Sequence, residues 1–463
     1  MNKVLLSVLI FLISLILNNC SVNKPAGFEK FKTNARKKAN LNRASLKSEK
    51  DYKEVFGIRV IKDPKQVENT KTILTKQIRL EEEFNSNLYV KISNEMPNQN
   101  SLNNQNDVGE LAYEGALQKI GKYKFSKFYD FDFINPNPLF YNKNLVFYDN
   151  KGAITLYDEN QKILWKNNFY NKSEKKIKPR LNFAAKNNIL IVTDDVAKYY
   201  AINIDTGELL WTKTNIVPFN SNIKIKDDVF YVVDYKNILR SISIQDGSEV
   251  WNLKTEESLT KSNTKISIAI DEKNIYFNNS IGDVTAVDIK SGQLIWQLPT
   301  QNNNISQNAF QLSNSELVIN ENTIFFSNNK NEFYSIDTVT GLINWITEIS
   351  SDLKPVVIGK LIITISEKGY LYIIDKKSGN IMRINDLFKN YKDKKRKQIK
   401  ATGFFVALNK IYLTNSDGKL IIVNGNEGSI LNIVKISGGK ILQPFINENN
   451  LFLISNGSII RFN

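Results

Sequence analysis

The sequence predicts an all-β protein: an eight-bladed β-propeller of four-stranded antiparallel blades, preceded by a signal peptide and a largely disordered basic tether. Three observations predict it: a Gly-x-x-x-Trp turn that recurs along the chain, short alternating strands between its copies, and incomplete units at both ends of the repeat region. The expected boundaries are 1–19 for the signal peptide, 20–110 for the tether and 111–463 for the propeller.

The repeat is a polar turn that ends in glycine and is followed four residues later by tryptophan. Trp165 stands in a variant copy without the glycine, and two later copies, at Gly379 and Gly428, have lost the tryptophan. The seven anchor positions lie roughly 38 to 49 residues apart, which is the length of a four-stranded blade. The complete copies are Gly207 to Trp211, Gly247 to Trp251, Gly292 to Trp296 and Gly341 to Trp345.

Both residues of the repeat have a structural explanation. Hairpin loops commonly need one residue at positive φ, which glycine adopts without a Cβ clash. A tryptophan on an outer strand can fill the wedge between neighbouring sheets and bury roughly 150 Å² or more. We therefore expect the repeated glycines and tryptophans to dock the blades against one another.

The two ends of the repeat region complement each other. Segments 440–445, 451–455 and 458–462 supply three strands of a last unit, and Ala116–Ile120 is a strand-like segment with no partners of its own. If they pair, the two ends of the repeat region close the ring and the exposed sheet edges of an open array disappear.

The first twenty residues have the pattern of an export signal. Lys3 precedes an apolar run over residues 4–17, and the run ends at Leu17-Asn18-Asn19-Cys20. The run is shorter than the roughly 20 residues that span a bilayer, although an uncleaved anchor remains an alternative. Leucine three residues before the chain's one cysteine resembles the lipobox of bacterial lipoproteins, which implies diacylation of Cys20; the alternative is an incidental buried thiol.

The positive charge of the chain, +15 overall, is concentrated in the tether. Residues 24–80 contain sixteen Lys or Arg against six Asp or Glu and show no sustained hydrophobic period, so they are expected to form a flexible linker. Such a segment can rest on anionic lipid head groups. Nucleic-acid binding is the rival interpretation, but an exported chain without a nucleic-acid-binding motif does not favour it.

Composition excludes most familiar active sites. The chain has no histidine and a single cysteine, so His or Cys zinc sites, histidine-dependent triads and intramolecular disulfides lack their parts. We expect no catalytic residue, no metal, no cofactor and no small-molecule substrate. The aspartates near the repeated turns are interpreted as turn formers whose carboxylates accept backbone N–H groups; they are Asp205, Asp246, Asp288, Asp337 and Asp375.

The Gly-x-x-x-Trp turns at this spacing resemble the quinoprotein-type, or PQQ-like, propeller repeat. With the leader, the chain is similar to the propeller lipoproteins of the outer-membrane β-barrel assembly machinery. This resemblance implies a non-catalytic scaffold, anchored through Cys20 in the outer membrane and facing the periplasm, whose partners are the barrel insertase and other lipoproteins of the complex. It also implies contact loops near 257–265 and 301–316, with Leu259, Lys261 and Glu316 as candidate partner-binding residues.

Two other functions share parts of this evidence. Quinone-dependent dehydrogenases resemble the chain in their repeat, but the resemblance implies a quinone held with calcium and often an adjacent-cysteine disulfide, and no cysteine pair exists here. An envelope module that binds glycan could use Tyr370 and Tyr372, which share one face of a strand; packing against a neighbouring blade competes with that role.

Overall fold

The structure is a computed structural model that describes residues 52–55, 58–61, 104–256, 265–300, 314–349 and 351–463. The chain divides into two units, Met1–Asp63 and Pro64–Asn463. In the first unit, β1 (Tyr52–Val55) pairs antiparallel with β2 (Ile58–Ile61), so a hairpin lies in the segment expected to be tether. The signal peptide and Cys20 lie outside the described residues, and their predicted roles stay predictions.

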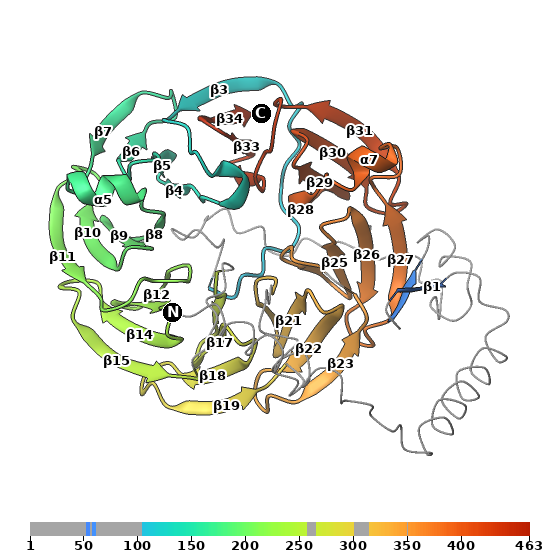
Figure 1. The fold of residues 1–463 in the computed structure, drawn as a ribbon, viewed down its shortest axis with the longest axis horizontal. Coiled ribbons are helices and arrows are strands. Elements are labelled where there is room, and N and C mark those ends of the chain that lie inside the picture. Colours follow the sequence, from blue (N-terminus) through green and yellow to red (C-terminus); the bar gives the residue numbers. More distant parts are fainter. Residues whose placement is uncertain (1–51, 56–57, 62–103, 257–264, 301–313, 350) are drawn as a thin grey trace, which may run out of the picture. The chain divides into compact units, whose positions relative to one another are not determined.

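The second unit is a ring of eight four-stranded antiparallel sheets, which confirms the predicted propeller (Figure 1). The first four blades follow one another along the chain, each running from its innermost to its outermost strand. Blade 1 is β4 (Leu139–Tyr141), β5 (Asn144–Tyr148), β6 (Ile154–Tyr157) and β7 (Ile163–Asn167); blade 2 is β8 (Leu181–Lys186), β9 (Ile189–Asp194), β10 (Lys198–Asn203) and β11 (Leu209–Thr214); blade 3 is β12 (Lys224–Lys226), β13 (Val229–Val233), β14 (Ile238–Ser243) and β15 (Glu249–Lys254); blade 4 is β16 (Ile268–Ile270), β17 (Asn274–Asn278), β18 (Val284–Asp288) and β19 (Leu294–Leu298).

The remaining blades repeat this order, except that the last one takes its outermost strand from the N-terminal part of the unit. Blade 5 is β20 (Val318–Asn320), β21 (Thr323–Asn328), β22 (Glu332–Asp337) and β23 (Ile343–Thr347); blade 6 is β24 (Val356–Ile358), β25 (Leu361–Ile365), β26 (Tyr370–Asp375) and β27 (Ile381–Asp386); blade 7 is β28 (Ala401–Ala407), β29 (Lys410–Asn415), β30 (Lys419–Asn424) and β31 (Ile430–Lys435); blade 8 is β32 (Phe445–Asn447), β33 (Asn450–Ser455), β34 (Ser458–Phe462) and β3 (Lys119–Lys124). Within the described residues, short helices lie in three connections: η1 (Phe131–Phe133), α5 (Lys172–Ile177) and α7 (Asp393–Arg396).

Pairing of β3 with β34 closes the ring, as the sequence predicts. The strand begins three residues later than expected, at Lys119 rather than Ala116. The reason is that the preceding residues wrap around the C-terminal residue: the Tyr113 hydroxyl and the Leu117 amide both donate to the carbonyl of Asn463, at 3.1 and 3.0 Å. Leu117 adopts a φ of 58°, which turns the chain into the strand.

Antiparallel order divides the loops between two faces of the ring. Connections from the first to the second strand of a blade, and from the third to the fourth, lie on one face, which we call the glycine-turn face because it carries the repeated glycines. Turns from the second to the third strand, and the connections between blades, lie on the other. We call this the long-loop face, because the longest connections are here, including those that hold η1, α5 and α7.

Residues 104–112 also belong to the propeller, although the sequence predicts a tether that extends to residue 110. They lie against the inner strands of several blades: the Ile270 amide donates to the Asn104 carbonyl, the Ile319 amide donates to the Gln105 carbonyl, and the Leu111 amide donates to the Val406 carbonyl. The sequence did not predict this role because the segment is mostly polar and has no strand pattern. Its backbone groups form hydrogen bonds with residues that lie far along the chain.

Candidate functional site

The repeated tryptophans and glycines meet between blades rather than within one hairpin. The Trp211 ring lies on Gly247 of the next blade, where a Cβ atom would come within 2.6 Å of the ring. The indole N–H of Trp211 donates to the Ile244 carbonyl at 2.9 Å. The same ring-on-glycine contact joins Trp165 to Gly207, Trp251 to Gly292, Trp296 to Gly341 and Trp345 to Gly379. Two constraints therefore favour glycine at each of these positions: the backbone has a φ between 69° and 76°, and the tryptophan ring leaves no room for a Cβ atom.

At the junction between blades 8 and 1, the glycine lies on the outermost strand and the larger residue lies in the turn, which is the opposite of the other junctions. Blade 8 has Gly121 on its outermost strand at the place of the tryptophan, and blade 1 has Gln161 at the place of the turn glycine. A Cβ atom at Gly121 would lie 2.8 Å from the Gln161 amide nitrogen. The bulky and the small residue have exchanged places across this junction, so Trp165 needs no glycine in its own turn.

The turns themselves are held by side-chain acceptors at the end of the third strand. The Asp288 carboxylate accepts the amides of Lys290 and Ser291, and Asp337 does the same one blade later. In blade 2 the acceptor is Asn203, whose side chain receives the amides of Asp205 and Thr206, so Asp205 is not the turn's acceptor.

Of the candidate partner-binding residues, the structure describes Glu316, which belongs to the long-loop face. Leu259 and Lys261 lie outside the described residues. Glu316 is half-buried at the end of the connection from blade 4 to blade 5, and one carboxylate oxygen lies 3.8 Å from the ammonium of Lys354, in the connection from blade 5 to blade 6. Glu316 therefore forms an ion pair with a lysine of its own chain.

Lys265 stands beside Glu316 at the base of the neighbouring connection. Its ammonium group donates to the side chain of Asn182 in blade 2. Desolvation lowers the pKa of Lys265 to about 8, against the opposing charges of Glu316 and Asp195, although the residue keeps an exposed surface. An exposed amine that is partly neutral near physiological pH can act as a hydrogen-bond donor or acceptor.

A buried lysine lies further inside, at the innermost strand of blade 3. Lys224 is 1% exposed, and its ammonium donates to the Asn106 side chain at 2.6 Å. The Asn106 amide in turn donates to the carbonyls of Ile268 and Leu317, at 3.0 and 2.7 Å, so it links blades 3, 4 and 5. Burial lowers the pKa of Lys224 well below its usual value.

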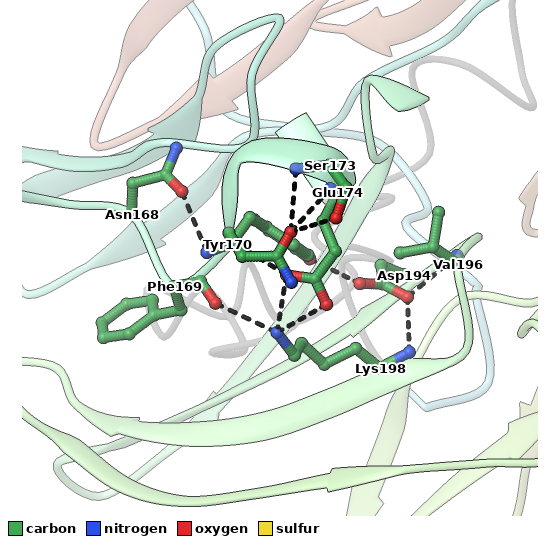
Figure 2. Close-up of polar contacts among 9 residues, drawn as sticks. Asn168, Phe169, Tyr170, Ser173, Glu174, Asp194, Val196 and Lys198 are labelled. Carbon is green, nitrogen blue, oxygen red and sulfur yellow. Dashed lines mark hydrogen bonds and ion pairs between the residues drawn. The ribbon is translucent and has the colours of Figure 1, made fainter. Parts of the chain in front are cut away.

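Helix α5, between blades 1 and 2, is anchored by a polar cluster beneath it (Figure 2). The Tyr170 hydroxyl donates to Asp194 at 2.5 Å. The Lys198 ammonium lies 3.1 Å from Glu174 and 3.0 Å from the Phe169 carbonyl. Asn171 caps the helix by accepting the amides at its first turn, while Glu174 accepts the Asn171 amide, so six residues form a fixed helix.

Asp194 carries a charge in an apolar setting. It is fully buried, and its second oxygen accepts the amides of Val196 and Lys198 at 3.0 and 2.7 Å. Burial raises the pKa of Asp194 to about 6, while the Tyr170 hydroxyl and these amides oppose the shift. Burial and the nearby Tyr200 and Asp194 also raise the pKa of Tyr170.

The tyrosines proposed for glycan binding are both half-buried. The guanidinium of Arg396, the last residue of α7, lies 5.5 Å from the centre of the Tyr370 ring and donates to its hydroxyl at 3.1 Å. It also pairs with Asp386 at 2.7 Å. Tyr370 is therefore covered by its own chain, as expected for packing.

The described part of the chain contains no group of three His, Cys, Asp or Glu side chains placed to hold a metal ion. None of the helices described is both long and apolar enough to cross a membrane.

Sequence reasoning missed the residues at the centre of the ring and under α5. Lys224 and Asn106 are 118 positions apart, and no local pattern predicts that they meet. For Asp194 there was no signal in the sequence either, because Asp149 and Asp234 hold the same turn position in the neighbouring blades and accept backbone amides in the same way.

Comparisons with known proteins agree with this architecture. A family model described as outer membrane protein assembly factor BamB matches residues 150–385, which is half of the chain. BamB of Shewanella oneidensis is 22% identical over 277 residues, which cover 58% of this chain and 67% of that protein. BamB of Francisella tularensis is 26% identical over 171 residues, 35% of each chain.

Solved structures share the fold. BamB from Moraxella catarrhalis superposes with a TM-score of 0.59 at 15% identity, covering 75% of this chain and 100% of that one. Quinohemoprotein alcohol dehydrogenase from Comamonas testosteroni gives a TM-score of 0.60 at 9% identity, covering 84% and 83%. At these identities the two superpositions establish the propeller and leave the choice of function to other evidence.

Proposed function

We propose that this chain, which belongs to the family of outer membrane protein assembly factor BamB, is a non-catalytic scaffold in the assembly of outer-membrane β-barrels. The observation that carries the proposal is the match of the BamB family model from β6 of blade 1 to β27 of blade 6, in a closed eight-bladed ring. We further propose that Cys20 is diacylated and that the protein faces the periplasm from the outer membrane.

The proposed partner is the barrel insertase, together with other lipoproteins of the assembly complex. The long-loop face supports this part of the proposal, because the connections from blade 3 to blade 4 and from blade 4 to blade 5 both end beside charged groups of the ring, Lys265 and Glu316. Leu259 and Lys261 belong to the first of these connections and are the proposed apolar anchor and cation.

Binding of the purified full chain, in detergent, to the purified periplasmic domains of the insertase tests this proposal. We expect Leu259→Ser with Lys261→Glu to weaken the complex by about tenfold or more, since a lost apolar anchor and a reversed charge each remove binding energy. Lys290→Glu, an exposed turn residue of the glycine-turn face, is the matched control and should leave binding unchanged. Failure of the unmodified chain to bind would overturn the proposal.

A quinone-dependent dehydrogenase is the second candidate, favoured by the superposition on the alcohol dehydrogenase. A ligand on the axis beside blades 3 to 5 would have to displace Asn106, which is buried and bonded to all three. Tight binding of pyrroloquinoline quinone with calcium, followed by dye-linked alcohol oxidation, would support the enzyme instead of the scaffold.

A further inference from the structure

Helix α5 and the residue after it present lysines whose charges are not neutralised. Among the residues that the structure describes, none of these lysines forms an ion pair, whereas Lys198 beneath the helix is paired with Glu174. All lie at the surface, Lys175 being half-buried and the others exposed. The four are Lys172, Lys175, Lys176 and Lys178.

Exposed apolar side chains accompany these lysines. Ile177 at the end of α5 is 64% exposed, and Tyr129 and Phe133, from the connection between blades 8 and 1, are 83% and 87% exposed. The two connections are in contact: the Lys178 ammonium lies 4.1 Å from the Tyr129 ring centre, and Arg180 pairs with Asp130 at 2.5 Å. We call the four lysines together with Tyr129, Phe133 and Ile177 the α5 patch.

The patch is held in one conformation before any partner arrives. The capping box of α5, the Tyr170 to Asp194 bond and the Lys198 contacts fix the helix (Figure 2). In the neighbouring connection, the Lys440 ammonium donates to the Asp132 carbonyl at 2.9 Å. A fixed surface loses little conformational entropy on binding, so it suits recognition better than a mobile loop does.

We infer that the α5 patch docks an acidic polypeptide segment that carries an apolar side chain. Charge complementarity is the argument: the patch places four cations around three exposed apolar groups, against the exposed carboxylate of Asp132, while Glu174 and Asp130 already have partners. Carboxylates of the segment pair with the lysines, and its apolar side chain covers Phe133 or Ile177.

A protein fits this surface better than an anionic membrane does. Asp132, the middle residue of η1 and next to Phe133, is exposed, and a uniformly negative lipid surface would repel its carboxylate, whereas a folded partner can place a donor there.

This inference goes beyond the proposed function, because it does not use Leu259, Lys261 or the insertase. The experiment measures binding of a fluorescein-labelled peptide of glutamate and leucine to the full chain in detergent at physiological ionic strength. The test variant is Lys175→Glu with Lys176→Glu. The matched control is Lys290→Glu with Lys377→Glu, which changes the net charge equally on the glycine-turn face.

We expect the test variant to bind the peptide about tenfold more weakly, and the control about as tightly as the unmodified chain. Phe133→Ser should also weaken binding, without changing its salt dependence, since it removes an apolar contact and no charge. Circular dichroism of the variants should be unchanged, because the replaced side chains lie at the surface.

Two results would overturn the inference. The first is an equal loss of affinity in test and control variants, which would show that net charge alone attracts the peptide. The second is a loss of binding to phosphatidylglycerol vesicles in the test variant while peptide binding is unaffected, which would make the patch a membrane contact.

Discussion

Replacing Tyr170 with phenylalanine removes a single hydroxyl group from the cluster under α5. That hydroxyl donates to the Asp194 carboxylate at 2.5 Å, and both residues are buried. The ring of phenylalanine has the same shape, so the change deletes the hydrogen bond while keeping the packing against Tyr200. What remains is a buried carboxylate held by the amides of Val196 and Lys198.

The pH dependence follows from the pKa of Asp194, which is raised from 3.8 to about 6. A raised acidic pKa means that this group favours folding most below pH 3.8 and that its contribution is lost as the pH rises through 6. Because one pKa unit corresponds to about 1.4 kcal/mol, keeping Asp194 ionised costs the folded chain about 3 kcal/mol at pH 7.5.

The Tyr170 hydroxyl offsets part of that cost, and only while the carboxylate is charged. We therefore expect Tyr170→Phe to lower the free energy of unfolding by about 1.5 to 3 kcal/mol at pH 7.5, the range for a hydrogen bond to a charged group. At pH 5, where Asp194 is mostly protonated, the loss should shrink to about 0.5 to 1.5 kcal/mol, as for a neutral hydrogen bond.

Urea unfolding at both pH values measures this difference, and hydrogen exchange of the α5 amides shows whether the helix loosens with it. Tyr157→Phe is the control, since its hydroxyl donates to the neutral Lys124 carbonyl at 2.7 Å and its loss should not depend on pH. The reasoning is refuted if Tyr170→Phe costs the same at pH 5 and 7.5, or if it still shows the pH dependence when combined with Asp194→Asn.

Three further predictions concern other parts of the ring. Gly247→Ala should lower the unfolding free energy by about 2 kcal/mol, because its φ of 69° and the tryptophan ring above it both oppose a Cβ atom; Gly438→Ala, with open space around it, should stay within about 0.5 kcal/mol, and urea unfolding compares the two. The Lys224 pKa is lowered in the fold, so the native chain should gain stability relative to Lys224→Met as the pH rises from 7 toward the ordinary lysine value of 10.5; thermal unfolding across that range checks the sign. An amine-reactive reagent at pH 8 should label Lys265, whose pKa is about 8, faster than the exposed Lys290, as mapped by mass spectrometry; equal rates would contradict the assigned pKa.

Several features of the ring could be predicted from sequence because they depend on residues close together. The Gly-x-x-x-Trp turns set the blade length and number, and the incomplete units at both ends predict the closure that β3 makes with β34. The position of β3 was wrong by three residues because its start depends on Asn463, at the other end of the chain. Less of the candidate site could be predicted from the sequence. The resemblance indicated the approximate loops, but the ion pair of Glu316 with Lys354 and the hydrogen bond of Tyr170 with Asp194 under α5 could not be predicted.

By itself, then, the sequence determined the class of fold, the repeat and the way the ring closes, because strand periodicity and turn chemistry act over a few residues. Only the tertiary structure decided that each tryptophan covers the next blade's glycine, that residues 104–112 bond to the inner strands, and that the side chains of Lys224 and Asp194 are buried. These contacts join residues tens to hundreds of positions apart, and their energies depend on burial, which no short window of sequence encodes.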